Sequence, residues 1–183
     1  MKKALFLIFY LVIASLLWDV KDLHAEHLAL RERMARAESY AAEGELDFAF
    51  MEYRALLQEG PEGPLAQKAT FAIGEYYFKQ RSTHEAKQAF EKFREASAEE
   101  VPKLLATVYL VQCARFLEDA AAVKAFDSYL KETISSKKLF LAFEENRMQE
   151  WTSPLGNRFQ LREFLDRLEI SLNDAPFYTI SLP

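Results

Sequence analysis

Three alanines recur along the chain at nearly equal intervals, and this repetition limits the fold more than any other feature. Ala49, Ala86 and Ala122 are separated by steps of 37 and 36 residues, and an aromatic residue stands four positions after each of them. A small side chain lets two helices approach closely, while a large ring fills the space beside the contact. Such a unit cannot bury its apolar face alone, so several units must stack. The repetition therefore predicts a row of packed helix pairs.

The composition agrees with a helical protein of one domain. The chain has 183 residues with only 5 glycines and 6 prolines, and half of its residues are apolar. Alanine, leucine, glutamate, lysine and arginine lose little on entering a helix. We therefore expect an all-α fold with a substantial core.

The residues around the alanines resemble the tetratricopeptide repeat (TPR), a helix-pair motif with a period of about 34 residues. The first unit has the small, aromatic, turn and terminal-proline residues of the pattern, namely Ala37, Tyr40, Gly44, Leu46, Ala49, Tyr53 and Pro61. The second unit has its counterparts at Ile73, Gly74, Tyr77, Ala86, Phe90 and Phe93. The third unit is degenerate, because only its second helix matches, through Ala122, Phe126 and Tyr129.

The resemblance implies a TPR-like α-solenoid of about three helix pairs over residues 19–133, with capping helices and a tail over 134–183. One capping helix is expected from Lys137 to about Trp151. A second is expected to begin at Asn157, because Asn157 and Gln160 resemble a capping box. The tail from Phe177 to Leu182 is β-prone and uncharged. It either lies extended against the last helices or pairs with the sheet edge of a partner.

The N-terminus predicts membrane targeting. Lys2 and Lys3 precede an uncharged run from Ala4 to Trp18, which orients the remainder of the chain across a membrane. Residues 1–18 are therefore expected to be a signal peptide or a signal-anchor transmembrane segment. The expected location is the bacterial inner membrane with the body in the periplasm.

Two readings of this segment remain open. Its length of roughly 15 apolar residues is short for a membrane span and favours a cleaved signal peptide, exported to the periplasm. The lack of a clean cleavage site, and of any glycine or proline before Gly44, favours an uncleaved anchor that continues into the first helix. The apolar stripe from Val20 to Ala41 packs on the chain's own helices or forms a short dimer stalk.

No motif indicates catalysis, a cofactor or a metal. The phosphate-binding glycine loops and the hydrolase elbow are missing from the sequence, and His24 and His27 lack a third ligand. Paired carboxylates such as Glu99–Glu100 are typical of solvated helix faces. The single cysteine, Cys113, lies in an apolar run and is expected to be a buried thiol. The net charge of −5 argues against nucleic-acid binding.

The TPR resemblance implies that the first helix of each pair lines a concave surface that binds a peptide or a helix. The partner-binding residues implied in this way are Arg31, Glu38, Lys68, Phe71, Glu75, Phe78, Lys79, Thr107, Val111 and Arg115. Met34, Phe71, Phe78 and Val111 have a competing interpretation, because they can pack against neighbouring helices or the C-terminal cap.

The leading hypothesis is a membrane-tethered or exported adaptor that mediates protein–protein interaction within a bacterial envelope assembly. The alternative is a self-associating structural subunit of a larger machine. A third hypothesis, an enzyme or small-ligand binder, needs a deep polar pocket that the sequence does not indicate.

Overall fold

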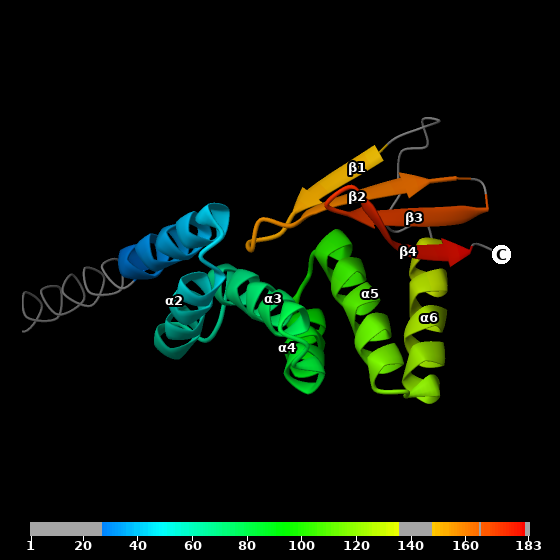
Figure 1. Ribbon diagram of the computed structural model, residues 1–183, viewed down its shortest axis with the longest axis horizontal. Helices are drawn as coiled ribbons and strands as arrows, with labels where there is room; N and C mark the ends of the chain where they lie inside the picture. The colour runs from blue at the N-terminus through cyan, green and yellow to red at the C-terminus, as the bar shows by residue number, and fades with distance from the viewer. Residues whose placement is uncertain (1–26, 136–147, 165, 182–183) are drawn as a thin grey trace, which may run out of the picture.

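The computed structural model describes residues 27–135, 148–164 and 166–181, and these form a row of helices followed by a small antiparallel sheet (Figure 1). Residues 27–43 form the first helix. The later helices are α2 (Leu46–Glu59), α3 (Pro64–Lys79), α4 (Thr83–Ala96), α5 (Glu100–Phe116) and α6 (Ala120–Ser135). The predicted N-terminal segment, residues 1–18, lies outside the described residues. No helix within the described ranges is long and apolar enough to cross a membrane.

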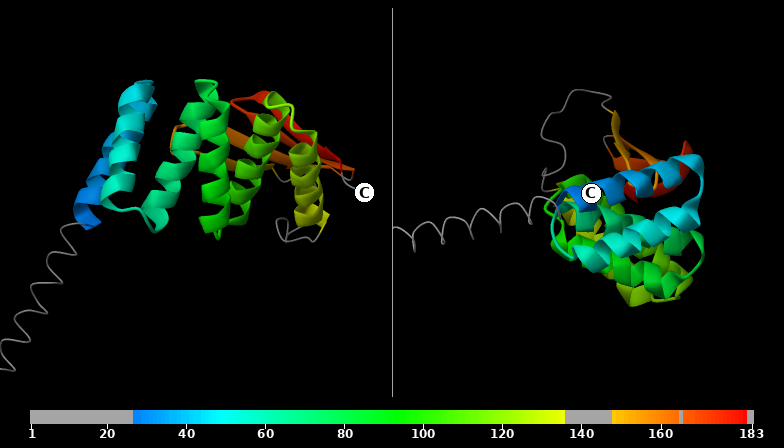
Figure 2. Two further views of the ribbon diagram at one scale, coloured as in Figure 1. Left: turned by 90° about the horizontal axis from the view of Figure 1, so that it is seen from below. Right: turned by 90° about the vertical axis from the view of Figure 1, so that its left-hand side faces the viewer.

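Consecutive helices pack side by side, as Figure 2 shows. Gly44 ends the first helix with φ of +83°, a conformation that favours glycine, and the chain then reverses into α2. In α3, a Cβ added at Gly74 would lie 2.9 Å from the ring of Phe90 in α4, so only glycine allows this approach. The small and aromatic residues of the repeats thus have the packing role that the sequence predicted.

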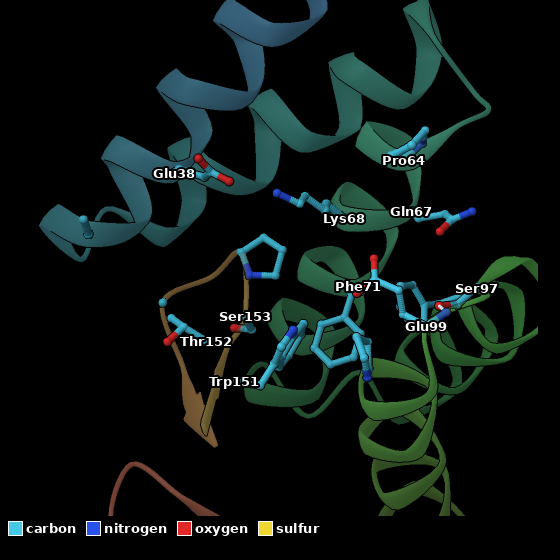
Figure 3. A pocket seen from close by; sticks show the side chains of 15 residues that line it. Glu38, Pro64, Gln67, Lys68, Phe71, Ser97, Glu99, Trp151, Thr152 and Ser153 are labelled. Atoms are coloured by element: carbon cyan, nitrogen blue, oxygen red, sulfur yellow. Dashed lines mark hydrogen bonds between the residues drawn. The ribbon is translucent and has the colours of Figure 1, made fainter. Parts of the chain in front are cut away.

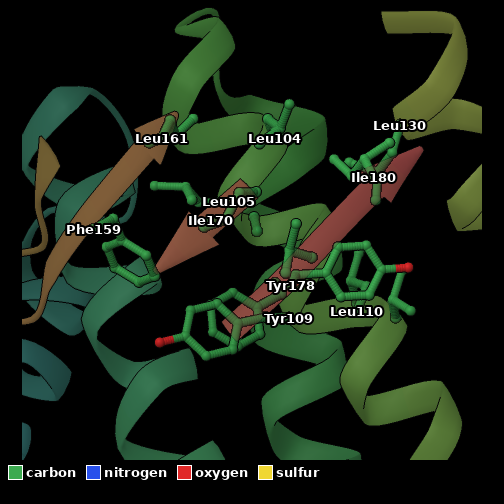
Figure 4. Packing of buried hydrophobic residues seen from close by; sticks show 14 of the residues in the cluster. Leu104, Leu105, Tyr109, Leu110, Leu130, Phe159, Leu161, Ile170, Tyr178 and Ile180 are labelled. Atoms are coloured by element: carbon green, nitrogen blue, oxygen red, sulfur yellow. The ribbon is translucent and has the colours of Figure 1, made fainter. Parts of the chain in front are cut away.

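Two apolar clusters form the core. The first cluster joins the first helix, α2 and α3, and its fully buried members include Ala37, Ala49 and Tyr53. The second cluster joins α3 to α6 with one face of the sheet, and Figure 4 shows part of it. Its centre is Tyr109, whose ring stacks on Phe90 with centroids 4.4 Å apart. The sheet is therefore part of the main core.

The prediction of C-terminal capping helices is wrong for the residues that the structure describes after position 147, because these residues form strands. The strands are β1 (Met148–Thr152), β2 (Arg158–Glu163), β3 (Arg167–Leu172) and β4 (Ala175–Ser181), in the order β1-β2-β3-β4. All three pairings are antiparallel. The described part of the chain is thus mostly helical rather than all-α. Residues 137–147 of the first predicted capping helix lie outside the described residues.

The side-chain alternation explains why this region forms strands. Phe159 and Leu161 in β2 are buried, as are Leu168 and Ile170 in β3, while the residues between them are more exposed. This period of two puts one apolar face against the helices. Asn173 and Asp174 join β3 to β4 with φ of 50° and 65°, which suits a tight two-residue hairpin.

Of the two alternatives for the tail, the structure agrees with the first as far as Ser181, because the tail is extended and lies against α5 and α6. Its pairing with β3 of the same chain was not predicted. Gln112 in α5 donates a 3.2 Å hydrogen bond to the backbone oxygen of Phe177. Tyr178 donates to the carboxylate of Asp127 in α6, and the guanidinium of Arg115 lies 5.1 Å from the centre of the Tyr178 ring. β4 therefore completes the chain's own sheet and fixes it to the helices.

Candidate functional site

A pocket of about 440 Å³ opens between the helix row and the loop that joins β1 to β2. The first helix, α3, the end of α4, the start of α5 and the β1–β2 loop all contribute to it. Its lining includes Glu38, Gln67, Lys68, Phe71, Phe93, Ser97, Glu99, Trp151, Ser153 and Pro154 (Figure 3). The pocket thus combines residues more than 100 positions apart, and it exists only because the sheet folds back onto the helices.

Aromatic rings form the apolar part of the pocket. The ring of Phe71 in α3 contacts Trp151 of β1 edge-on, with centroids 4.9 Å apart, and Phe93 of α4 at 5.0 Å. Phe71 is fully buried, whereas Trp151 remains half-buried. The exposed part of Trp151, held in place by the buried ring of Phe71, therefore offers a rigid apolar surface that loses little freedom when a ligand binds.

Three charged side chains lie at the pocket, and each is exposed: Glu38 from the first helix, Lys68 from α3 and Glu99 before α5. Figure 3 shows Lys68 extending towards the first helix. None of the three forms an ion pair with another described residue, although Arg33 nearby pairs with Glu52 and Glu59 at 2.9 and 2.7 Å. The charged groups at the pocket are therefore available to a ligand.

The β1–β2 loop is fixed to the helices by polar contacts. The hydroxyl of Tyr53 in α2 donates a 2.6 Å hydrogen bond to the backbone oxygen of Pro154. Within the loop, the backbone nitrogen of Ser153 donates to the oxygen of Asn157 at 2.9 Å, and the nitrogen of Asn157 donates to the Ser153 hydroxyl at 3.1 Å. These contacts set the position of the loop wall of the pocket.

Glu75 of α3 lies buried at the base of the same loop. Its Oε1 atom accepts hydrogen bonds of 3.0 Å from the hydroxyl of Tyr109 and from the side-chain nitrogen of Asn157. Its Oε2 atom is buried and has no hydrogen-bond partner among the described residues. Burial raises the pKa of Glu75 to about 7, although the polar groups of Ser153, Asn157 and Tyr109 favour the charged form.

The structure separates the ten predicted binding residues into three groups. Glu38, Lys68 and Phe71 come together in the pocket. The protein itself uses a second group: it buries Glu75, Thr107 and Val111, half-buries Phe78 against Tyr109, and places the exposed Arg115 against the ring of Tyr178 in β4. Arg31 and Lys79 are exposed outside the pocket. The chain's own sheet therefore occupies much of the surface that the TPR resemblance assigned to a partner.

Sequence reasoning missed the residues that the sheet contributes, above all Trp151, Ser153 and Pro154. Trp151 was expected to be the end of a capping helix, and no binding role was expected for Ser153 or Pro154. The signal that could have found them is the period-two alternation that begins at Phe159. An antiparallel partner strand across a short turn would then place Trp151 opposite Phe159, as observed.

Two further sequence expectations concern reactive groups. Cys113 is fully buried in α5, and burial raises the pKa of its thiol to about 12. Over the described ranges, no cluster of three or more histidine, cysteine or acidic residues is arranged to hold a metal ion. His24 lies outside those ranges.

No family model and no curated protein matches this sequence.

Proposed function

We propose that this protein is a TPR-like adaptor that binds an extended segment of another protein in the pocket beside the β1–β2 loop. The observation that carries the proposal is the pocket itself, which combines an aromatic floor with three charged groups that have no ion-pair partner among the described residues. Anchor side chains of protein partners characteristically fill such desolvated apolar cavities, while charges at the rim align the flanking residues.

The chemistry of the pocket defines the partner segment. A volume of about 440 Å³ accommodates one or two large side chains, and the half-buried ring of Trp151, packed on the buried rings behind it, suits an aromatic or aliphatic anchor. A carboxylate on the segment would pair with Lys68. A basic group would pair with Glu38 or Glu99. The proposed segment is therefore apolar at its centre and charged at its flanks.

We further propose that the adaptor acts at a bacterial envelope, tethered to the inner membrane or exported to the periplasm. The support is the N-terminal sequence, in which Lys2 and Lys3 precede the uncharged run from Ala4 to Trp18. The role that follows is to hold a subunit of a membrane-associated assembly close to the bilayer.

One observation favours the second candidate, a self-associating structural subunit. Phe48 and Met51 in α2 are 49% and 55% exposed, and α2 lies in the N-terminal part of the helix row (Figure 1). The ends of stacked helices require a polar cap to remain soluble. Light scattering over a range of concentrations tests this candidate: a mass that stays monomeric would remove it.

Affinity capture with the full chain from bacterial membranes tests the adaptor proposal. The capture is compared between the wild type, Lys68→Glu at the pocket and Lys92→Glu on the exposed surface of α4. Charge reversal at a site of direct pairing costs about 1 to 3 kcal/mol, so we expect roughly ten-fold weaker retention with Lys68→Glu alone. Equal retention by all three proteins, or no retained partner, would contradict the proposal.

A further inference from the structure

Glu75 lies between α5 and the β1–β2 loop, and polar groups from both face its carboxyl. Tyr109 faces it from α5, and Asn157 and Ser153 face it from the β1–β2 loop. Tyr53 of α2 is close enough for the charge of Glu75 to raise the pKa of its phenol, and Glu38 of the first helix acts on Tyr53 in the same way. No described lysine or arginine forms an ion pair with Glu75.

Glu75 is the carboxyl to which the donors of this cluster bind, and burial raises its pKa to about 7. Burial raises the pKa of the Tyr109 and Tyr53 phenols well above 10, so both remain neutral donors. Asn157 and Ser153 do not titrate. The net charge of the cluster formed by Glu75, Tyr109, Asn157 and Ser153 therefore depends on whether Glu75 carries its proton.

The neutral and the ionised forms of Glu75 differ in the free-energy cost of burying them. The neutral acid keeps both hydrogen bonds to Oε1 and leaves one uncharged oxygen without a partner. The ionised form strengthens the two hydrogen bonds that Oε1 accepts, but it also puts charge on a buried Oε2 atom that has no hydrogen-bond partner among the described residues. Burying charge on such an atom costs far more free energy than burying an unpaired neutral group. Water that reaches Oε2 would lower the free-energy cost of ionising Glu75.

The β1–β2 loop can move more easily than the helices around Glu75. The helices on either side of Glu75 are fixed by the fully buried Phe71, Phe90 and Tyr109. By contrast, the loop is fixed to them by polar contacts through Pro154 and Asn157, and its Gly156 is exposed. Because Ser153, Pro154 and Gly156 line the pocket, movement of the loop changes the pocket.

We propose that Glu75 is a proton-operated latch. With its proton bound, it holds the Ser153–Asn157 loop against α3 and α5 and keeps the pocket narrow. When the proton leaves, the loop separates from the helices and the pocket widens. This inference does not depend on the identity of a partner.

The test combines two measurements on the full chain. Carbon NMR of labelled glutamate side chains follows the protonation of Glu75. Amide hydrogen exchange, corrected for its intrinsic pH dependence, follows the loop through the bonded nitrogens of Ser153, Gly156 and Asn157. The variants are Glu75→Gln, which keeps an acceptor but no titrating charge, and the exposed control Glu95→Gln in α4.

We expect Glu75 to titrate near pH 7 and the loop amides to lose roughly ten-fold protection between about pH 6 and about pH 8. The amide of Ile170 in β3 should stay protected, and the control should behave as the wild type. Glu75→Gln should abolish the pH dependence of the loop. The proposal is overturned by a Glu75 midpoint below about 5, by loop protection that does not change, or by the same change in Glu75→Gln. If Glu75→Gln does not fold, coincidence of the two wild-type midpoints decides the question.

Discussion

The hydroxyl of Tyr53 donates a 2.6 Å hydrogen bond to the backbone oxygen of Pro154, across 101 positions of the sequence. This contact joins the second helix of the row to the tip of the sheet. It also places Pro154 at the wall of the pocket. The helix row and the sheet are thus coupled at the candidate site as well as in the core.

Replacing Tyr53 by phenylalanine removes this contact and keeps the ring. The backbone oxygen of Pro154 loses a donor, so we expect the free energy of unfolding to fall by about 1 to 2 kcal/mol. Urea denaturation measures the loss. Tyr77→Phe is the control, because the Tyr77 ring packs against Phe50 and its hydroxyl makes no hydrogen bond to a described residue. Equal stability of Tyr53→Phe and the wild type would show that the contact contributes nothing.

Replacing Gly74 by alanine is expected to destabilise the protein, although alanine normally favours a helix interior by about 1 kcal/mol over glycine. The new Cβ would lie 2.9 Å from the Phe90 ring, which is fully buried and stacked on Tyr109. Overpacking of this kind costs about 1 to 3 kcal/mol. Thermal unfolding measures the change, and Phe90→Leu in the same chain should relieve part of it. A gain in stability for Gly74→Ala alone would refute this packing.

The stability of the protein should fall as the pH rises from about 4.5 to about 7. The pKa of Glu75 is raised in the folded state from 4.5 to about 7, so the folded protein keeps a proton that the unfolded chain has lost. A raised pKa stabilises the folded state at low pH, and this contribution is lost as the pH passes the folded value. The shift corresponds to about 3 kcal/mol. Denaturant unfolding at several pH values should show this slope in the wild type and not in Glu75→Gln; a flat wild-type profile would exclude it.

Cys113 should not react with thiol reagents in the folded protein. Its side chain is fully buried, and burial raises its pKa to about 12, so almost no thiolate exists at neutral pH. A colorimetric disulfide reagent should therefore report the thiol only after denaturant is added. Complete labelling of the native protein within minutes would mean that α5 opens readily.

Replacing Tyr178 by alanine tests whether the tail belongs to the chain's own fold. Tyr178 is buried, donates to Asp127 and contacts Arg115, so its truncation should cost about 3 kcal/mol or more. Thr179→Ala is the matched control, because Thr179 is exposed on the other face of β4. If both variants unfold at the wild-type temperature, β4 does not contribute to the core.

The helix row was predictable because its signal is local. Ala49, Ala86 and Gly74 are small where two helices touch, and each contact depends on residues less than about 40 positions apart. The C-terminal sheet was missed because Asn157 and Gln160 fit a capping box equally well. In the structure, Asn157 instead bonds to Glu75 and closes the β1–β2 loop.

The candidate site could be predicted only in part, for a related reason. Glu38, Lys68 and Phe71 lie on helices, so the repeat pattern placed them on one face. Whether that face stays open depends on where the sheet packs, and this is a long-range contact that no local pattern specifies. The clearest sequence signal of a hairpin in this region was the Asn173–Asp174 pair, because these residue types tolerate a positive φ. Both residues have a positive φ in the structure.

Photo-crosslinking in intact membranes tests whether the pocket beside the β1–β2 loop holds a partner protein. A photoreactive residue is introduced at position 68 in the pocket and, in a separate chain, at position 92 on the exposed surface of α4. We expect position 68 to yield a discrete crosslinked protein that position 92 does not. Crosslinking from neither position, or the same products from both, would contradict it.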